Sequence, residues 1–245
     1  MDWRGVTPEV ITDVQELLSA PRLTPYRQAT GGDLADALTL YTLNVQLSAA
    51  FYESLHYFEV GLRNRLDQQL TAWAATLDLA PSASAGSHDS AQAPGGRRDV
   101  ALGPTPTGEL PWYRHPQVPL SLNARRKVMT AIRAATRDGR EELPGRVVAE
   151  LTFGFWWSLL AEEYNRSLWQ PCLREAFAQV RRQRLHSAVD DLRQLRNRIA
   201  HHEPIHGRDL HRDYTQLLDT AGRITPRLHW LIDTTSRVPA LLPAR

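Results

Sequence analysis

The residues best suited to chemistry lie close together near the end of a helical stretch. Arg196 and Asn197 precede the pair His201 and His202 in the string LRNRIAHHEPI. A histidine titrates near neutral pH, so it can take the proton from a 2′-hydroxyl or give one to a leaving 5′-oxygen. An arginine can hold the phosphate and stabilise the charge that develops on it. Together these residue types predict cleavage of RNA without a metal ion.

The helical spacing of these residues permits a joint site without requiring one. At about 100° per residue, Asn197 and His201 lie one turn apart on the same side of a helix. Arg196 is five positions before His201, so the two diverge by about 140° in a straight helix. A long arginine side chain, or a loosened last turn before Pro204, would bring them together. The C-terminal end of a helix also favours a cationic histidine, which biases His201 towards the role of an acid.

The apolar pattern predicts that helices position these residues. A long helix is expected from about Gly31, with apolar residues every three or four positions as far as Leu70, and Gly61 is the place where it would bend or break. Residues 122–138 are expected to form a basic helix, and 147–164 an aromatic helix whose tryptophans pack in the core. Further helices are predicted over residues 182–201, 209–222 and 226–235. No stretch alternates convincingly with period two, so the predicted fold class is all-α, a helical bundle with a long N-terminal helix.

One segment interrupts this helical pattern. Residues from about 80 to 108 are rich in Pro, Gly, Ser and Ala and nearly free of large apolar side chains. Such a segment cannot recover its ordering entropy by burial, so we expect a flexible, disordered insertion. The chain has 245 residues, a length that suits one domain with an insertion. We therefore expect a single helical domain over 1–245, interrupted at 80–108.

Charge is spread unevenly along the chain. The net charge is only +2, yet residues 1–120 carry 8 Lys and Arg against 13 Asp and Glu, a balance of −5. Residues 121–245 carry 21 against 14, a balance of +7, and Lys127 is the one lysine among them. Arginine matches the geometry of phosphate, so this half suggests a nucleic-acid partner. Solvated arginines on ordinary surface helices explain the same charge.

The composition also bears on the compartment. No run approaches the roughly 20 apolar residues that a membrane helix needs, and the start MDWRGVTPEV lacks the basic and apolar segments of a secretion signal. Cys172 is the single cysteine, so no internal disulfide can form. We expect a cytoplasmic protein without a membrane partner.

A metal site is the main alternative use of the histidines. Residue types that bind metals gather at His201, His202, Glu203, His206 and His211. Pro204 and Gly207 interrupt this group, and no zinc spacing of the HExxH kind is present. Nothing specifies a basic partner that would activate Cys172 as a nucleophile. We therefore expect neither a metal nor a cofactor.

The candidate motif resembles the signature of a known group of domains. Arg196, the polar Asn197, three further residues and then His201 resemble the Rx4-6H signature of HEPN domains. The longer string LRNRIAHHEPI, which follows an LREAF segment, resembles the C-terminal motif of Abi-like proteins, a phage-abortive-infection family.

Two other parts of the chain resemble the same family. Tyr41, Asn44 and residues 58–64 (FEVGLRN) are similar to its N-terminal helix, and residues 147–156 (VVAELTFGFW) are similar to its central segment. The resemblance spans nearly the whole chain except residues 80–108.

This resemblance implies both a fold and an activity. It implies a HEPN-like helical bundle and a homodimer whose two motifs meet in one composite cleft. It also implies metal-independent cleavage of RNA that leaves a 2′,3′-cyclic phosphate. Arg196 and His201 become the catalytic pair, and Asn197 the polar residue that orients them. His202 satisfies the loose spacing as well, so either histidine fits the acting position.

A repeat of the motif adds supporting candidates. The tetrapeptide LRNR occurs at residues 62–65 and again at 195–198. Glu59 and Arg63 are four residues apart, which fits either a surface salt bridge on a helix or two groups that line the same cleft. We take both as supporting site residues. Residues expected to contact RNA are Arg193, Arg198 and Asn64.

Two functions remain in competition. The first is a metal-independent endoribonuclease, a toxin or phage-defence effector that acts on RNA. An antitoxin protein is a further partner that such a toxin can have. The second is a non-catalytic module with the HEPN fold that binds RNA or a protein through the same basic face. They differ over His201, because only the enzyme should lose its activity when that residue is replaced.

Overall fold

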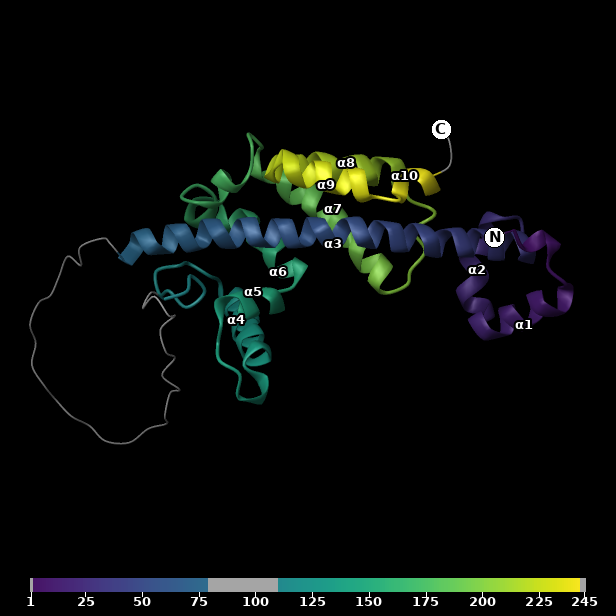
Figure 1. Cartoon of the computed structure of the whole chain (residues 1–245), viewed down its shortest axis with the longest axis horizontal. Helices are drawn as coiled ribbons and strands as arrows, with labels where there is room; N and C mark the ends of the chain where they lie inside the picture. Colours follow the sequence, from purple (N-terminus) through teal and green to yellow (C-terminus); the bar gives the residue numbers. More distant parts are fainter. Residues whose placement is uncertain (1, 79–109, 243–245) are drawn as a thin grey trace, which may run out of the picture. The chain divides into compact units, whose positions relative to one another are not determined.

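The computed structural model describes residues 2–78 and 110–242 (Figure 1). Helices dominate this part of the chain and no strand occurs within it, which confirms the all-α fold class. The insertion expected at 80–108 lies outside the described residues. Across residues 2–78 and 110–242, no helix is both long and apolar enough to span a membrane.

The described residues fall into two compact units. The first takes in residues 2–62 and 178–242, and the second 63–78 and 110–177. The first unit contains α1 (Pro8–Leu18), α2 (Ala20–Ala29), the first part of α3 (Leu34–Asp78), α7 (Arg182–Ala200), α8 (Leu210–Ile224), α9 (Pro226–Thr235) and α10 (Val238–Leu241). The second contains the rest of α3, α4 (Leu122–Ala135), α5 (Pro144–Glu150) and α6 (Phe153–Ser158). That the chain forms a single domain stays a prediction.

Helix α3 is the long helix that the apolar pattern predicts. The Asp33 carboxylate accepts a hydrogen bond from the backbone N–H of Asp36 at 2.7 Å, which caps its N-terminal end. The predicted apolar positions are buried at Leu47, Phe51, Leu55, Phe58, Leu62, Leu66 and Leu70. Leu40 and Leu43 are only half-buried. Full burial of such a side chain stabilises the fold by about 1.5–3 kcal/mol, so this stripe is the main apolar contribution of α3.

Helix α3 does not break at Gly61, so that part of the expectation was wrong. Helix α3 continues through this position from Leu34 to Asp78. A Cβ atom at Gly61 would lie 2.6 Å from Cδ2 of Leu228 on α9, far closer than van der Waals contact allows. Glycine is therefore used here for close approach between two helices and not for backbone flexibility.

The remaining core of the first unit comes from its C-terminal helices. Helix α8 packs against both α7 and α9, and Figure 1 shows α8 and α9 side by side. Helix α8 begins where the Asp209 carboxylate accepts from the backbone N–H of Arg212 at 2.9 Å. Fully buried side chains on these helices are Leu185, Val189, Leu192, Leu195, Leu217, Ala221 and Ile232. The inward face predicted for residues 182–201 is thus confirmed at Leu185, Leu192, Leu195 and Ile199, whereas Ala188 is only half-buried.

In the second unit, the single aromatic helix expected over 147–164 was wrong. Helix α5 ends at Glu150, and α6 starts at Phe153. Between them Leu151 is extended, and the Thr152 hydroxyl accepts from the backbone N–H of Phe155 at 3.4 Å. A threonine that caps a new helix interrupts the old one, because its side chain satisfies a donor that the continuous helix would have used. Short 3-10 and π turns then fill residues 162–176.

The aromatic residues of this unit nevertheless pack in its core, as expected. Trp112 and Trp156 are each at most 1% exposed, and their ring centroids are 5.9 Å apart. The Trp112 indole donates to the Asp67 carboxylate at 2.7 Å, so its polar N–H is satisfied. Burial raises the pKa of Asp67, although this hydrogen bond and the charge of Arg63 lower it in part.

The basic helix of this unit is shorter than predicted. Helix α4 ends at Ala135, and a 3-10 turn follows over Arg137–Gly139. Asp138 and Gly139 both have a left-handed backbone, with φ of 61° and 74°. Such a backbone cannot continue a right-handed helix, so α4 cannot extend through residue 138.

Candidate functional site

The candidate motif occupies the last turn of α7 and the loop that follows. The backbone N–H of His202 donates to Ile199 O at 3.0 Å, and that of Glu203 donates to Arg198 O at 2.8 Å. These two bonds form a Schellman motif, the arrangement that closes many helices with a left-handed residue. His202 is that residue, with φ of 56°. The position is one where glycine is usual, so His202 carries backbone strain at the end of the motif.

His201 is the exposed residue that caps α7. Its backbone N–H donates to Asn197 O at 2.9 Å, which is the bond of a regular helical turn. Asn197 and His201 therefore lie one turn apart on the same side, as the spacing predicts. The last turn is not loosened towards Arg196, and among the described residues no hydrogen bond or ion pair joins Arg196 to His201.

Arg196 is instead held by Glu59 of α3. The Arg196 Nε lies 3.4 Å from Glu59 Oε2, with side chains 32% and 23% exposed. This Nε is buried, and no group within the described residues completes a hydrogen bond to it with good geometry. The ion pair engages the Nε side of the guanidinium, and its other N–H groups stay available to a ligand. Glu59 was expected at the site, but its pairing with Arg196 was missed.

Asn44 of α3 fixes the loop after the two histidines. Its side-chain Oδ1 accepts from the backbone N–H of Ile205 at 2.8 Å and from that of His206 at 3.1 Å. Asn44 is only 4% exposed and Ile205 is fully buried. Two backbone bonds to one buried amide hold the 203–206 loop against α3, and so determine where the end of α7 lies.

Next to this loop is a pocket of about 640 Å³ in the first unit. Its walls come from α2, α3 and the end of α7, and include Arg22, Tyr26, Tyr41, Asn44, Tyr52 and His202. His201 is not among the lining residues, although it is adjacent to His202 in the chain. The pocket therefore distinguishes the two histidines that the sequence motif treats as equivalent.

His206 lies beneath the same region and packs on a pocket residue. Its ring centroid is 4.9 Å from that of Tyr26. The Nδ1 atom of His206 is buried without a hydrogen-bond partner in the described chain. Burial lowers the pKa of His206, because the charged imidazolium would lose its hydration there.

A family model for Abi-like proteins matches residues 21–206 of this chain. The chain belongs to the Abi-like protein family. The matched segment covers the candidate motif and the whole of α3, whereas α8, α9 and α10 lie beyond it. "Abi" denotes abortive infection, so membership suggests a role in phage defence. No curated protein and no solved structure matches the chain.

The arginines expected to contact RNA in this Abi-like protein are engaged with its own chain. Arg198 donates to Pro204 O at 2.9 Å and lies 3.7 Å from Glu203 Oε2, so it stabilises the end of α7. Arg193 makes a hydrogen bond of 2.6 Å to Asp190. Both are only partly exposed. Their role in binding RNA stays a prediction.

The two remaining candidates lie in the second unit. Arg63 and Asn64 are consecutive residues of α3, and Arg63 Nε donates to Asn64 Oδ1 at 3.4 Å. Asn64 is exposed and Arg63 half-buried. Their contribution to the site likewise stays a prediction.

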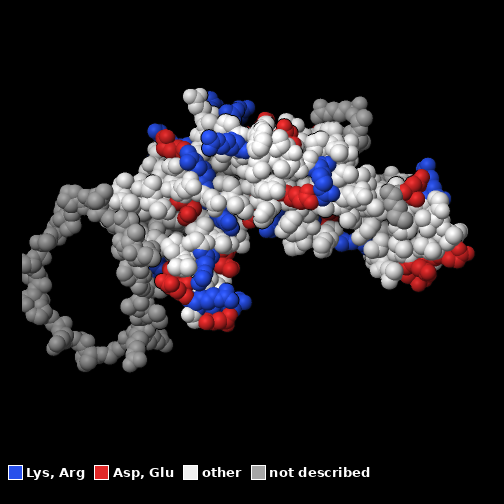
Figure 2. All heavy atoms as spheres, in the orientation of Figure 1, with Lys and Arg blue, Asp and Glu red and all other residues white. Residues whose placement is uncertain are grey.

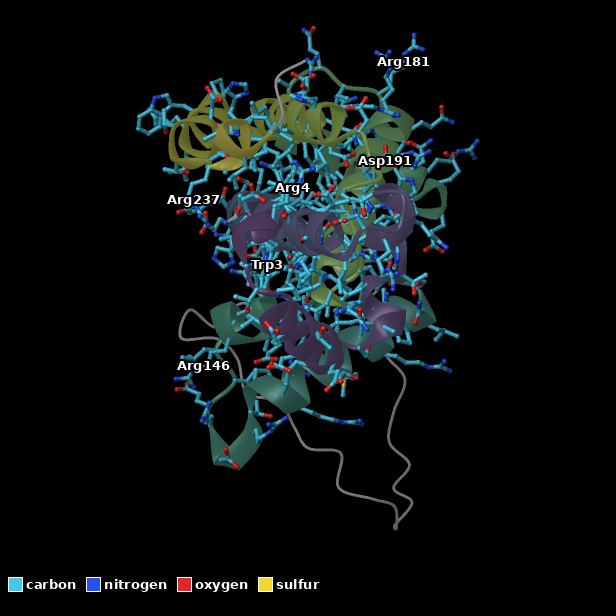
Figure 3. All side chains as sticks on the ribbon, turned by 90° about the vertical axis from the view of Figure 1, so that its right-hand side faces the viewer. Trp3, Arg4, Arg146, Arg181, Asp191 and Arg237 are labelled. Atoms are coloured by element: carbon cyan, nitrogen blue, oxygen red, sulfur yellow. The ribbon has the colours of Figure 1, made fainter. Side chains whose placement is uncertain are left out.

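The charged side chains of the Abi-like protein are often paired. In Figure 2 acidic and basic side chains lie next to one another on the visible face. Glu53 and Arg237 form an ion pair at 2.6 Å. Figure 3 shows Arg181, just before α7, directed away from the ribbons. Asp191 lies further along that helix, where Gln216 of α8 donates to it at 3.2 Å. The excess of arginine in residues 121–245 is thus partly neutralised.

The other reactive side chains offer little alternative chemistry. Within residues 2–78 and 110–242, no three His, Cys, Asp or Glu side chains gather closely enough to hold a metal ion. Cys172 is buried, and this burial raises the pKa of its thiol to about 12. A thiol with that pKa stays protonated at neutral pH and is a poor nucleophile.

Proposed function

We propose that this Abi-like protein is a metal-independent endoribonuclease that acts in phage defence. The observation that carries the proposal is the end of α7, where Arg196 is oriented by Glu59 and His201 is exposed on the adjoining turn. An arginine held by a carboxylate and an accessible histidine are the two groups that cleavage of RNA by its own 2′-hydroxyl needs. Membership of a family named for abortive infection supports the biological role.

The proposed reaction divides the work between these residues. His201 takes the proton from the 2′-hydroxyl while water supplies one to the leaving 5′-oxygen, or, in the reverse assignment, water takes the first proton and His201 supplies the second. The 2′-oxygen forms a bond to phosphorus, and the bond from phosphorus to the 5′-oxygen breaks. The Arg196 N–H groups that Glu59 leaves unoccupied stabilise the charge on the phosphate oxygens. The products are a 2′,3′-cyclic phosphate and a 5′-hydroxyl.

A homodimer completes the proposed site. Arg196 and His201 diverge by about 140° around a regular helix, and α7 keeps its regular bonding up to His201. Two copies that face each other would place the Arg196 of one beside the His201 of the other. Asn197, on the same side as His201, orients the pair, and Arg193 and Arg198 extend the contact with RNA. An antitoxin partner would act by covering this surface.

The proposal is tested by RNA cleavage in excess EDTA. Purified wild type and His201→Ala are incubated with total cellular RNA, and the fragment ends are analysed. We expect the wild type alone to cleave and to leave cyclic phosphate ends. Cleavage by both proteins to the same extent would remove His201 from the mechanism, and cleavage that EDTA abolishes would contradict a metal-independent reaction.

The second candidate function is a non-catalytic HEPN-fold module that binds RNA or a protein. It is favoured by the lack of any direct bond between Arg196 and His201 within one described chain. The two functions separate on one pair of measurements. A binding module leaves RNA intact, and His201→Ala binds RNA with nearly the affinity of the wild type.

A further inference from the structure

We propose that the pocket beside His202 binds one nucleotide of single-stranded RNA, with the base among its tyrosines and the phosphate on Arg22. The inference rests on the proposed function, because it names the part of the substrate that this site recognises. It is drawn from four features of the pocket: its fixed amide donor, its unbalanced positive charge, its aromatic walls and its position at the end of the motif.

The fixed donor is the amide nitrogen of Asn44. Its Oδ1 already accepts from the backbone N–H groups of Ile205 and His206 at 2.8 and 3.1 Å. A backbone N–H can only donate, so this pair of bonds determines which end of the amide is oxygen. No described residue accepts a hydrogen bond from the Nδ2 of Asn44, and Nδ2 is not among the fully enclosed unpaired atoms. Because Asn44 lines the pocket, Nδ2 is a ready donor for an acceptor atom on a base.

The charge of the pocket favours a phosphate. Arg22 lines it, is half-buried, and forms no ion pair with the described residues. Glu53 is the carboxylate in the lining, but it is bound by Arg237 at 2.6 and 3.0 Å. The Glu53 charge is therefore already balanced, and the positive charge of Arg22 is not. A partly buried, unpaired guanidinium next to neutral walls attracts an anion that it can bind in a forked manner.

The walls of the pocket suit a flat aromatic group. Tyr26 is 1% exposed and meets Tyr41 edge-on, with ring centroids 5.2 Å apart. Tyr52 also lines the pocket and is 48% exposed, so part of its ring is open to solvent. Single-stranded RNA is commonly recognised by bases that leave the stack and pack on aromatic side chains. A volume of about 640 Å³ lies within the usual range of about 300–1,000 Å³ for small-ligand sites and has room for one nucleotide.

The position of the pocket connects it with the proposed cleavage. His202 forms part of its edge, and His201 is the next residue in the chain. A nucleotide held in the pocket therefore brings the neighbouring phosphate of the same strand to the end of α7. The pocket selects single-stranded RNA, because a base paired in a duplex cannot turn away into it.

The test measures binding of an RNA that cannot be cleaved. The probe is a fluorescein-labelled single strand of mixed sequence with 2′-fluoro riboses, which lack the attacking hydroxyl, and the readout is fluorescence anisotropy. We expect Tyr52→Ala and Arg22→Gln each to raise Kd by about tenfold, since stacking on one aromatic ring contributes a factor of roughly 5 to 150. Tyr52→Phe keeps the ring and should bind like the wild type.

Matched controls remove the same side chains outside the pocket. Tyr57 is a 38% exposed tyrosine on α3, and Arg27 is an exposed arginine on α2, and neither lines the pocket. Tyr57→Ala and Arg27→Gln should leave Kd within twofold of the wild type. Wild-type affinity for both Tyr52→Ala and Arg22→Gln would overturn the inference.

Parallel measurements separate this inference from the proposed function. If the wild type cleaves ordinary RNA in EDTA while the two pocket variants bind the probe normally, the pocket inference is wrong and the nuclease stands. If the wild type neither cleaves RNA nor binds the probe, both are wrong. If Tyr52→Ala changes the mass measured by light scattering without changing Kd, a second copy of the chain covers the pocket, which also overturns the inference.

Discussion

At the scale of single residues, the pair formed by Arg196 and Glu59 organises the candidate site. Its two side chains are about a quarter to a third exposed, at 23% and 32%. Such a pair contributes only about 0.2–1 kcal/mol to stability, so its main effect is to orient the guanidinium. Mutation of Glu59 should therefore affect catalysis far more than folding.

Replacement of Glu59 by Gln tests this role. We expect kcat/KM for RNA cleavage to fall by about tenfold to hundredfold, because a misplaced phosphate-binding group loses much of its effect. The thermal midpoint should change little. Asp36→Asn is the matched control, since it removes another ion pair of α3, with Arg4 at 2.7 Å. Unchanged cleavage by Glu59→Gln would show that Arg196 needs no such support.

The residues of the site could be only partly predicted from the sequence. Arg196, Asn197 and His201 could be proposed as candidates because they are close in the chain and match the spacing of a family motif. The ion pair of Glu59 with Arg196 joins residues that are far apart in sequence, and it exists only once α3 and α7 have packed together.

The pocket residues had a weaker signal that could have been used. Tyr41, Asn44, Ser48 and Tyr52 follow one another at helical spacing on a face of α3 that is more polar than the buried stripe. A polar and aromatic face opposite an apolar one indicates a surface that a ligand or partner can use. Arg22 and Tyr26 had no such pattern, because α2 meets α3 through tertiary contacts alone.

At the scale of elements, the end of α7 is a strained turn. His202 occupies the left-handed position of the Schellman motif, with φ of 56°. A residue with a Cβ atom at this left-handed position lowers the stability of the fold by about 1 kcal/mol relative to glycine. Both His201 and His202 are exposed, but only His202 is among the residues that line the pocket.

Substitution of His202 by Gly separates its structural role from a chemical one. We expect His202→Gly to raise the free energy of unfolding by up to about 1 kcal/mol in urea titrations, and to retain RNA cleavage if His201 is the acting histidine. His202→Val should lower stability, since a β-branched residue is poorly accommodated at positive φ. Loss of cleavage in a stable His202→Gly protein would assign the proton transfer to His202 instead.

The close approach of α3 and α9 gives a second prediction for an element. Alanine normally stabilises a helix by about 1 kcal/mol relative to glycine, but at Gly61 its Cβ would lie 2.6 Å from Leu228. We expect Gly61→Ala to lower the free energy of unfolding by about 1–2 kcal/mol, because overpacking costs more than the helical propensity returns. Gly145→Ala is the control, since that glycine of α5 has nothing within 4 Å, and it should be neutral or stabilising.

The element boundaries show where the sequence was informative. The long apolar stripe predicted α3, and the spacing of leucines predicted α7, because burial of one face is the main determinant of both. The division into α5 and α6 depends on a single threonine cap at Thr152, inside a run whose aromatic residues all favour burial. A capping hydrogen bond of this kind ends one helix and starts another, and the spacing of the apolar residues does not reveal it.

At the scale of the whole molecule, half-buried histidines make stability depend on pH. The pKa values of His206 and His186 are lowered, mainly by burial, from an ordinary value of 6.5. The unfolded chain therefore takes up protons at a pH where the folded chain does not. This contribution to stability is complete above about pH 6.5 and is lost as the pH falls towards the lowered folded values.

Replacement of His206 by Phe tests this dependence. The variant keeps an aromatic ring against Tyr26 and removes a buried nitrogen that has no hydrogen-bond partner in the described chain. We expect the wild type to lose free energy of unfolding between pH 7 and pH 5, and His206→Phe to lose less. Urea titrations at both pH values provide the measurement, and equal losses in the two proteins would show that His206 is not the group that titrates.

In the proposed reaction the 2′-hydroxyl of RNA, activated at the end of α7, is the nucleophile. The most direct measurement compares two short RNAs in excess EDTA, identical except for one 2′-deoxy nucleotide on the 5′ side of the mapped cleavage position. We predict that wild-type protein cleaves the unmodified strand there and leaves the modified strand intact at that position. Cleavage of both strands at the same position would contradict the account, because it would require a nucleophile other than the RNA itself.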